Sequence, residues 1–341
     1  MLQIENGIQI ATDDYYIIHK KNGIDELHFE VQLSDPIYLA INEEDRIYES
    51  TESQTYTVKS ISGSSKTAKI SCVIGLSSWE EEIDLHYDRT GTADMFLNGF
   101  KPSQWSIVDN HPRAEQRTIK MNSPTPLDVA MQVQDDFGCS LRFNTAEKTC
   151  TVIYPADMQL GNAYVIDTVN LRSAAAYKGK SSEICTRLYP FGHNGLTIAS
   201  VNDGKNYIDD FSYTSKIICA TWQDSRIESA SELLQAARRH LDEVSRPVRS
   251  WKLQVIDLFR TDAARWPDMR LDLFEVVKVV DTYKGISTAA MVVEDKVYPH
   301  SPEKNEITVS TEAKSVQKTL KSLYAQIMKP NSKYNQQLDH R

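Results

Sequence analysis

The densest group of side chains that could do acid–base chemistry is the run Glu80, Glu81 and Glu82, followed by Asp84. Paired carboxylates serve as acid and base in glycoside hydrolysis, but the two must face each other across a cleft, which a sequence does not show. Acidic residues are also favoured in the first turn of a helix, where they interact with the helix dipole. We therefore expect a solvated helix start over residues 78–81.

Two other sets of side chains could carry chemistry. Cys185 and His193 are close enough in sequence to be considered as a thiol nucleophile and its base, but Cys185 lies in an apolar strand pattern and nothing nearby would lower its pKa. His28 and His86 lie near carboxylates, yet neither has a second metal ligand three or four residues away. We assign no catalytic residue, no cofactor-binding residue, no cofactor and no metal ligand.

Composition excludes several classes of protein. The 341 residues are 40% hydrophobic and 25% charged, the balance of a globular protein with two or three domains. The formal net charge is −9, and residues 1–100 alone carry −11, which argues against a clamp for nucleic acid because phosphate binding needs a positive surface. The sequence contains no HExxH, GxSxG, Walker or GxGxxG motif.

The cysteines and the apolar segments indicate where the protein is made. The five cysteines are widely spaced with no CxxC pair, which favours reduced, buried thiols in a protein made in a cytosol. The first ten residues have no basic or apolar region of a signal peptide, and no stretch approaches the roughly 18 apolar residues of a membrane helix. We therefore expect no membrane insertion.

Residues 1–76 are predicted to form a first β unit. Leu27, Phe29, Val31 and Leu33 alternate with polar residues, which predicts a strand over 28–33. Further strands are expected over 47–48, 54–61 and 69–74. Short strands joined by turns are typical of a small barrel or sandwich.

Residues 77–164 are predicted to be an α+β insertion. A short helix is expected over 92–100, a strand over 116–121 and a hairpin over 140–154. The helix between them is better defined, because Thr125 can cap it, Pro126 fits its first position and Gly138 can end it.

Residues 183–310 are predicted to be a second β unit with a packed helix over 229–245. Ser229 and Glu232 have the spacing of a capping box, and Pro247 follows the helix. Strands are expected over 183–190, 251–255, 275–281, 289–297 and 307–310, with a loop-rich insertion over 192–222. A C-terminal helix and tail are expected over 311–341, where Val316, Leu320, Leu323 and Ile327 form an apolar stripe.

Four segments, in this order, resemble one protein family. They are the strand and turn of residues 25–38 with 56–59, the helix and hairpin of 124–152, the segment TRLYPFG at 186–192 with 195–207, and the helix and strand of 233–258. The chain resembles the N-terminal hub region of siphophage tail-associated lysins, also described as prophage tail endopeptidases or phage minor structural proteins. Many relatives have a Gly-Asp turn where this chain has Leu273, Phe274 and Glu275.

The resemblance implies a fold class: mainly β with α+β, with two small β-barrels side by side as in phage baseplate hubs. The strand return near residues 164–182 would then complete the first barrel. It also implies a homotrimeric ring that closes the tail tube, adapts sixfold to threefold symmetry and contacts a distal tail protein ring and a tape-measure protein. DNA would pass through its lumen without specific binding, beside acidic residues such as Asp25, Glu43, Glu44 and Asp45. The protein would lie at the virion tail tip after assembly in the host bacterial cytoplasm.

Two other functions remain open at this point. One is a peptidoglycan-degrading tail enzyme, since the family description includes the word endopeptidase, and the other is a tail module that binds host-wall sugars. In this family hydrolytic activity resides in a separate C-terminal domain, so the resemblance places no catalytic residue on this sequence. We therefore expect a structural protein that is not an enzyme.

Overall fold

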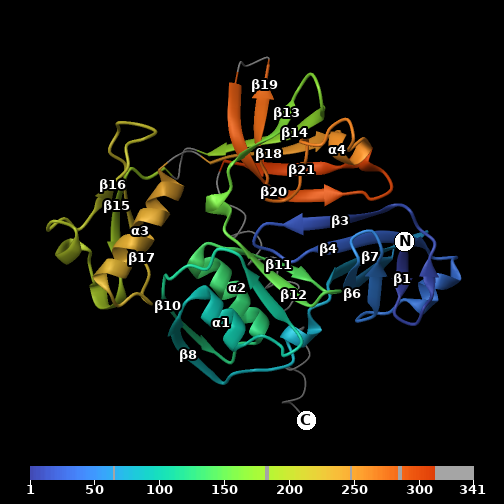
Figure 1. The fold of residues 1–341 in the computed structure, drawn as a ribbon, viewed down its shortest axis with the longest axis horizontal. Helices are drawn as coiled ribbons and strands as arrows, with labels where there is room; N and C mark the ends of the chain where they lie inside the picture. Colours follow the sequence, from blue (N-terminus) through green and yellow to red (C-terminus); the bar gives the residue numbers. More distant parts are fainter. Residues whose placement is uncertain (64–65, 181–183, 246–247, 283–285, 312–341) are drawn as a thin grey trace, which may run out of the picture.

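The computed structural model describes residues 1–63, 66–180, 184–245, 248–282 and 286–311. Figure 1 shows these residues as four groups of secondary structure: the two β units, the α+β unit and a separate lobe that contains α3. The fold is mainly β with α+β, as expected from the sequence. The predicted C-terminal helix falls on residues 312–341, outside the described residues.

The first β unit has the alternating pattern that the sequence predicts. In β4 (Glu26–Gln32), the side chains of Leu27, Phe29 and Val31 are buried and the intervening ones point outward. This strand pairs with β3 (Tyr15–Lys20) on one side and β7 (Thr67–Ile74) on the other. The remaining strands are β1 (Leu2–Ile4), β2 (Gln9–Ile10), β5 (Arg46–Glu49) and β6 (Gln54–Gly63). The strand β3 was not predicted.

The α+β unit shares a hydrophobic core with the first β unit. Its aromatic centre is formed by Trp79, Trp105 and Phe143, whose rings pack edge to face. It consists of β8 (His86–Gly91), α1 (Ala93–Gly99), β9 (Ser106–Asp109), β10 (Arg117–Asn122), α2 (Pro126–Phe137), β11 (Ser140–Asn144) and β12 (Thr149–Ile153). The helix predicted over 92–100, the helix capped by Thr125 and the hairpin over 140–154 are therefore confirmed.

The predicted helix start over residues 78–81 is wrong. The chain makes a single 3-10 turn over Ser77–Trp79, and it then continues without helix to β8. Two contacts explain the difference: the Trp79 side chain is buried in the core, and the Asp84 amide donates to the Pro124 carbonyl at 3.1 Å. These contacts anchor the segment at both ends, and the residues between them form bends and irregular structure in place of a helix.

In the described residues, the second β unit contains six strands around its own core. They are β13 (Leu160–Ile166), β14 (Leu171–Lys180), β18 (Val248–Val255), β19 (Val276–Asp281), β20 (Ile286–Val297) and β21 (Glu306–Ser310), with the short helix α4 (Leu258–Thr261) between β18 and β19. The expected return of residues 164–182 to the first barrel is wrong, because β13 pairs with β19 and β14 pairs with β18. Ala163 and Val165 of β13 are buried in this second core.

One sheet joins the two β units. The strand β20 pairs with β3, so the path runs β14-β18-β21-β20-β3-β4-β7-β6-β5-β1-β2, within a sheet of 13 strands. In this pairing Asp295 lies directly opposite His19. The strand pairings of the described residues do not close either unit into a barrel. The two expected barrels are thus replaced here by two parts of one continuous sheet.

Residues 184–245 form a separate lobe with its own core (Figure 1). It contains β15 (Arg187–Phe191), β16 (Ile208–Asp209), β17 (Cys219–Gln223) and the helix α3 (Ala230–Val244). The predicted helix is confirmed, but it packs on this three-stranded sheet instead of on the second β unit. The predicted capping box is wrong, because the Ser229 side chain accepts no cap hydrogen bond and Glu232 binds Arg117 of the α+β unit.

The turn before β19 adopts the backbone conformation that favours glycine. Phe274 has a φ of 74°, which is costly for a bulky side chain. Two features hold it there: the ring is buried, and the Phe274 amide donates to the Val292 carbonyl at 2.9 Å. A glycine at this position would adopt this φ without that cost.

The caps of α2 and α3 give a matched pair of variants. Thr125 accepts from the Asp128 amide and takes part in a capping box, so we expect Thr125→Ala to lower the free energy of unfolding by about 1 kcal/mol. Ser229→Ala should change it by clearly less, because Ser229 makes no cap bond. Urea unfolding of the two variants measures the difference, and equal losses would contradict the assignment of the caps.

Candidate functional site

The structure does not bring the predicted chemistry-bearing residues together. Glu80, Glu81 and Glu82 are exposed on the connection that precedes β8. Cys185 is buried and donates to the Arg187 carbonyl, and burial raises the pKa of its thiol, while His193 contacts the Ser225 carbonyl. None of these groups is arranged as an acid–base pair or as a nucleophile and its base.

The histidines considered as metal ligands have other partners. His28 contacts Glu26 and Ser71 and stacks on Tyr16, and His86 is exposed. In the residues that the structure describes, no three His, Cys, Asp or Glu side chains are arranged to hold a metal ion. Nor does this part of the chain contain a helix with the length and apolar character of a membrane span.

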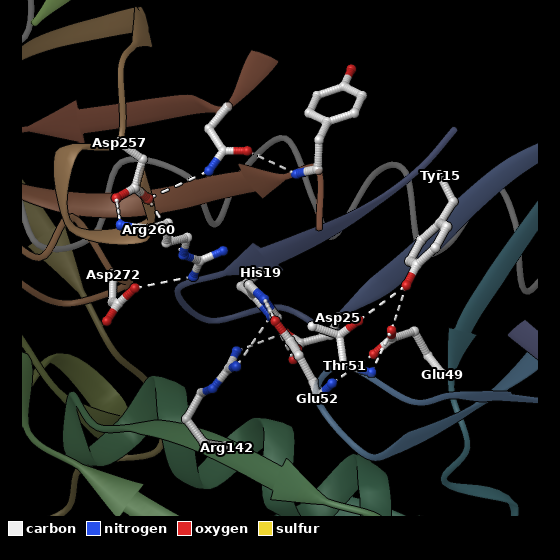
Figure 2. A network of polar contacts seen from close by, with 12 residues as sticks. Tyr15, His19, Asp25, Glu49, Thr51, Glu52, Arg142, Asp257, Arg260 and Asp272 are labelled. Carbon is white, nitrogen blue, oxygen red and sulfur yellow. Dashed lines mark hydrogen bonds and ion pairs between the residues drawn. The ribbon is translucent and has the colours of Figure 1, made fainter. Parts of the chain in front are cut away.

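The most unusual polar feature is a buried network between the units, centred on His19 (Figure 2). Its Nδ1 atom lies 3.1 Å from Asp25 and its Nε2 atom 3.1 Å from Glu52. The strand β3 alternates between buried and partly exposed positions, and His19 takes a buried position after Tyr15 and Ile17. A charged imidazole therefore stands where the strand pattern would favour an apolar side chain.

The α+β unit contributes Arg142, which extends from β11 into this network. Its Nη1 atom donates to Asp25 at 2.7 Å, and both side chains are largely or fully buried in the contact. Figure 2 shows Arg142 approaching His19 and Asp25 from the side of the α+β unit. Asp25 thus joins two units, and it is not available to line a lumen as the sequence analysis expected.

The second β unit contributes Asp295 and Arg260. Asp295 is 4% exposed and stands opposite His19 across the β20–β3 pairing. Arg260 of α4 binds Asp257 and Asp272 of its own unit, and its charge also acts on Asp295. One oxygen of Asp295, Oδ1, has no hydrogen-bond partner among the described residues.

A second buried carboxylate supports the turn that carries Glu52. Glu49 is fully buried, and it accepts the Tyr15 hydroxyl at 2.6 Å together with the amides of Thr51 and Glu52. These bonds fix the turn between β5 and β6, so that Glu52 reaches His19. Burial and the Glu49 carboxylate raise the pKa of the Tyr15 hydroxyl.

Charges of opposite sign control the protonation of the network. Burial opposes the charged form of His19, but Asp295 and Asp25 outweigh it and raise the imidazole pKa well above its usual value. Burial also opposes ionised Asp25, yet Arg142 and His19 hold its pKa below the usual value. Asp295 differs, since burial dominates over its three cationic neighbours and raises its pKa to about 6.

This arrangement can store charge and hold three units together, but it does not resemble a catalytic site. His19 and Asp25 are almost inaccessible to a substrate, and the partners of the imidazole among the described residues are Asp25, Glu52 and Arg142. No local pattern indicates the network, because His19 and Asp25 are joined by Glu52, Arg142 and Asp295 from distant segments of the chain. One sequence pattern could have indicated the network: at His19, a chargeable side chain takes a position where the alternation of the strand predicts an apolar one.

Comparison with known proteins identifies the type of fold. Residues 163–320 match the family model described as prophage endopeptidase tail. The resemblance to prophage tail proteins is confirmed. The matched residues span most of the second β unit and the lobe. The search of curated proteins found no match.

Solved structures share the prophage tail protein fold over nearly the whole chain. Prophage tail protein gp18 from Listeria monocytogenes has a TM-score of 0.67 and 15% identity, with 96% of this chain and 99% of that chain covered. The tail protein from Neisseria meningitidis has a TM-score of 0.63 and 10% identity, with 91% of this chain and 94% of that chain covered. The 43 kDa tail protein of prophage MuSo2 from Shewanella oneidensis has a TM-score of 0.62 and 12% identity, with 91% of this chain and 96% of that chain covered.

Removing Arg142 tests whether the network holds this tail-protein fold together. Arg142→Gln leaves Asp25 buried without one of its two cationic partners, so we expect a loss of about 3 kcal/mol in the free energy of unfolding. Arg113→Gln is the matched control in the same unit, because its ion pair with Asp157 is half exposed and should contribute under about 1 kcal/mol. Equal effects in urea unfolding would show that the network is energetically unimportant.

The raised pKa of Asp295 predicts a defined pH dependence. Because folding raises the pKa of this carboxyl from 3.8 to about 6, its contribution to stability is present below pH 3.8 and is lost as the pH rises through about 6. Asp295→Asn removes this ionisation. The free energy of unfolding of the variant should therefore gain on that of the wild type by roughly 3 kcal/mol between pH 4 and pH 8.

Thermal and urea unfolding across this pH range measure the effect. Asp268→Asn is the control, since Asp268 is exposed in the same unit and the substitution makes the same change of charge. A constant difference between wild type and Asp295→Asn at all pH values would contradict the assigned protonation.

Proposed function

We propose that this chain is a structural hub of a phage tail tip. In this proposal three copies form a ring that closes the tail tube and adapts its sixfold symmetry to threefold. The observation that carries it is the shared fold with Listeria monocytogenes prophage tail protein gp18, which covers 96% of this chain and 99% of that one. The protein would reach the virion tail tip after assembly in the host bacterial cytoplasm.

The arrangement of the two β units supports a role as a rigid ring subunit. They lie side by side in one sheet through β3 and β20, and the buried network ties both to the α+β unit. A ring subunit that connects a tube to other tail proteins needs such a fixed relation between its parts. The proposed partners are a distal tail protein ring and a tape-measure protein.

We propose no enzymatic activity for the chain. The family description contains the word endopeptidase, but Cys185, His193 and the acidic run of residues 80–82 have separate surroundings. DNA would pass through the lumen without specific binding. Glu43 and Glu44 are exposed and remain candidates to line that lumen, whereas Asp25 is buried.

The mass of the purified protein in solution tests the proposed trimer. One chain has a mass of 38.7 kDa, and we expect light scattering after size-exclusion chromatography to give three times that value. The measurement is made on the chain alone and on its mixture with the distal tail protein of the same prophage. A monomer in both samples would contradict the proposed ring.

The same preparation separates the hub from an enzyme. Applied to a peptidoglycan zymogram beside lysozyme as the positive control, the hub should produce no clearing. Lysis by this chain alone would replace the structural proposal with an enzymatic one.

A further inference from the structure

The lobe of residues 184–245 is connected to the remainder of the molecule at one place. The chain leaves the second β unit at Lys180, the last residue of β14, and returns at Val248, the first residue of β18. These two residues are paired with each other in the β14–β18 ladder. Both connections of the lobe therefore start from adjacent positions at one end of a two-stranded ladder, which is the geometry of a hinge.

Ion pairs hold the lobe against the α+β unit. Arg239 of α3 lies 2.7 Å from Glu115, and Glu232 lies 3.2 Å from Arg117. Arg226, which precedes α3, lies 2.8 Å from Asp136 of α2. A fourth, longer contact of 3.9 Å joins Glu228 to Lys120. We call these four pairs the latch.

The lobe and the α+β unit have separate apolar cores. The buried apolar residues of the lobe form a cluster of their own, separate from the core of the α+β unit. In the described part of the chain, no backbone hydrogen bond crosses between them. A cavity of about 140 Å³ lies in the interface and is lined from both sides, among others by Arg117, Asp136 and Trp222.

One polar atom of the latch is buried without a hydrogen-bond partner among the described residues. Arg117 is 6% exposed and contacts Glu115 and Glu232, but its Nε atom has no hydrogen-bond partner among the described residues. Glu232 is recruited to this contact in place of the capping box that its spacing with Ser229 predicts. Arg117 and Asp136 are buried, while Arg226 and Arg239 are partly exposed, and an interface of such charges around a cavity resembles a contact between domains that move more than it resembles a core.

We propose that residues 184–245 are a hinged lobe, anchored at the end of the β14–β18 ladder and held closed by an ionic latch that opens when its charges are screened or competed for. The closed state is the one in Figure 1, with α3 beside β10 and α2. Opening separates Glu115, Arg117, Lys120 and Asp136 from their partners. It makes both charged surfaces available to another charged partner. The proposal does not depend on the trimer.

A distance measurement between two spin labels tests the latch. Cys219 of the lobe is exposed and the other four cysteines are buried, so one label attaches to the native chain. Asn98→Cys on the exposed side of α1 supplies the second label in the α+β unit. Raising NaCl from about 0.1 M to about 1 M shortens the screening length from about 10 Å to about 3 Å, so we expect a longer and broader distance population to appear at high salt.

Variants separate the latch from a general effect of salt. The pair Glu232→Gln and Arg239→Gln should produce the longer population already at about 0.1 M NaCl. The matched control is Arg113→Gln with Asp157→Asn, which removes an equally short ion pair outside the latch and should leave the short distance unchanged. Circular dichroism confirms that each variant is folded. A short, unchanged distance at both salt concentrations and in the latch variant would overturn the proposal.

Discussion

The relation between the two β units depends on one pair of residues that face each other across a strand junction. His19 and Asp295 are directly opposed where β3 meets β20, and both are buried with charge of opposite sign. A shift of the pairing by one residue would turn Asp295 to the other face of the sheet and leave His19 and Arg142 without that carboxylate. Buried ion pairs contribute little to stability when compared with well-packed apolar side chains, but they penalise the wrong register strongly. The pair therefore acts mainly on specificity: it selects one alignment of the two units, and Arg142 extends that selection to the α+β unit through Asp25.

The same chain uses charge in a different way at the lobe. In the network, His19 and Asp25 are excluded from water, so dissolved ions have little access to them. We expect their contact to persist as long as the protein is folded. In the latch, Arg117 and Asp136 are buried, but Arg226 and Arg239 remain 45% and 35% exposed, so ions in solution can reach these two arginines and compete for them. The apolar cores follow this division, because the first β unit and the α+β unit share one core while the lobe has its own. The exposed arginines of the latch and the separate core of the lobe thus distinguish a reversible contact from a fixed junction, although both contain arginine and carboxylate groups.

Much of the fold can be predicted from local patterns, and the errors have specific physical causes. The strands β4, β5, β6 and β7 and the helix α2 follow from alternation, capping and a terminal glycine, all of which act within a few residues. The helix expected at residues 78–81 fails because the buried Trp79 and the Asp84 amide anchor the chain in other contacts. The capping box at Ser229 fails because Glu232 has a charged partner in Arg117. The assignment of residues 164–182 to the first barrel fails because strand partners are chosen across the whole chain. The buried network was missed for the same reason: its members are distant in sequence and meet through β-sheet pairing.

The burial of several acidic side chains changes how the net charge of the first hundred residues should be interpreted. The net charge of −11 includes Asp25, Glu49 and Glu52, which are committed to His19, Arg142 and Tyr15 inside the molecule. The charges of Asp25 and Glu52 are compensated locally by His19 and Arg142, so they add little to the field felt by a partner or a passing polymer, whereas Glu49 is bound by neutral donors only. The exposed acids, such as Glu43, Glu44 and the run at residues 80–82, determine that field instead. A count of charges along the sequence therefore overstates the surface acidity, and the position of these exposed residues decides whether the acidic third repels a polymer, binds a basic partner or maintains solubility.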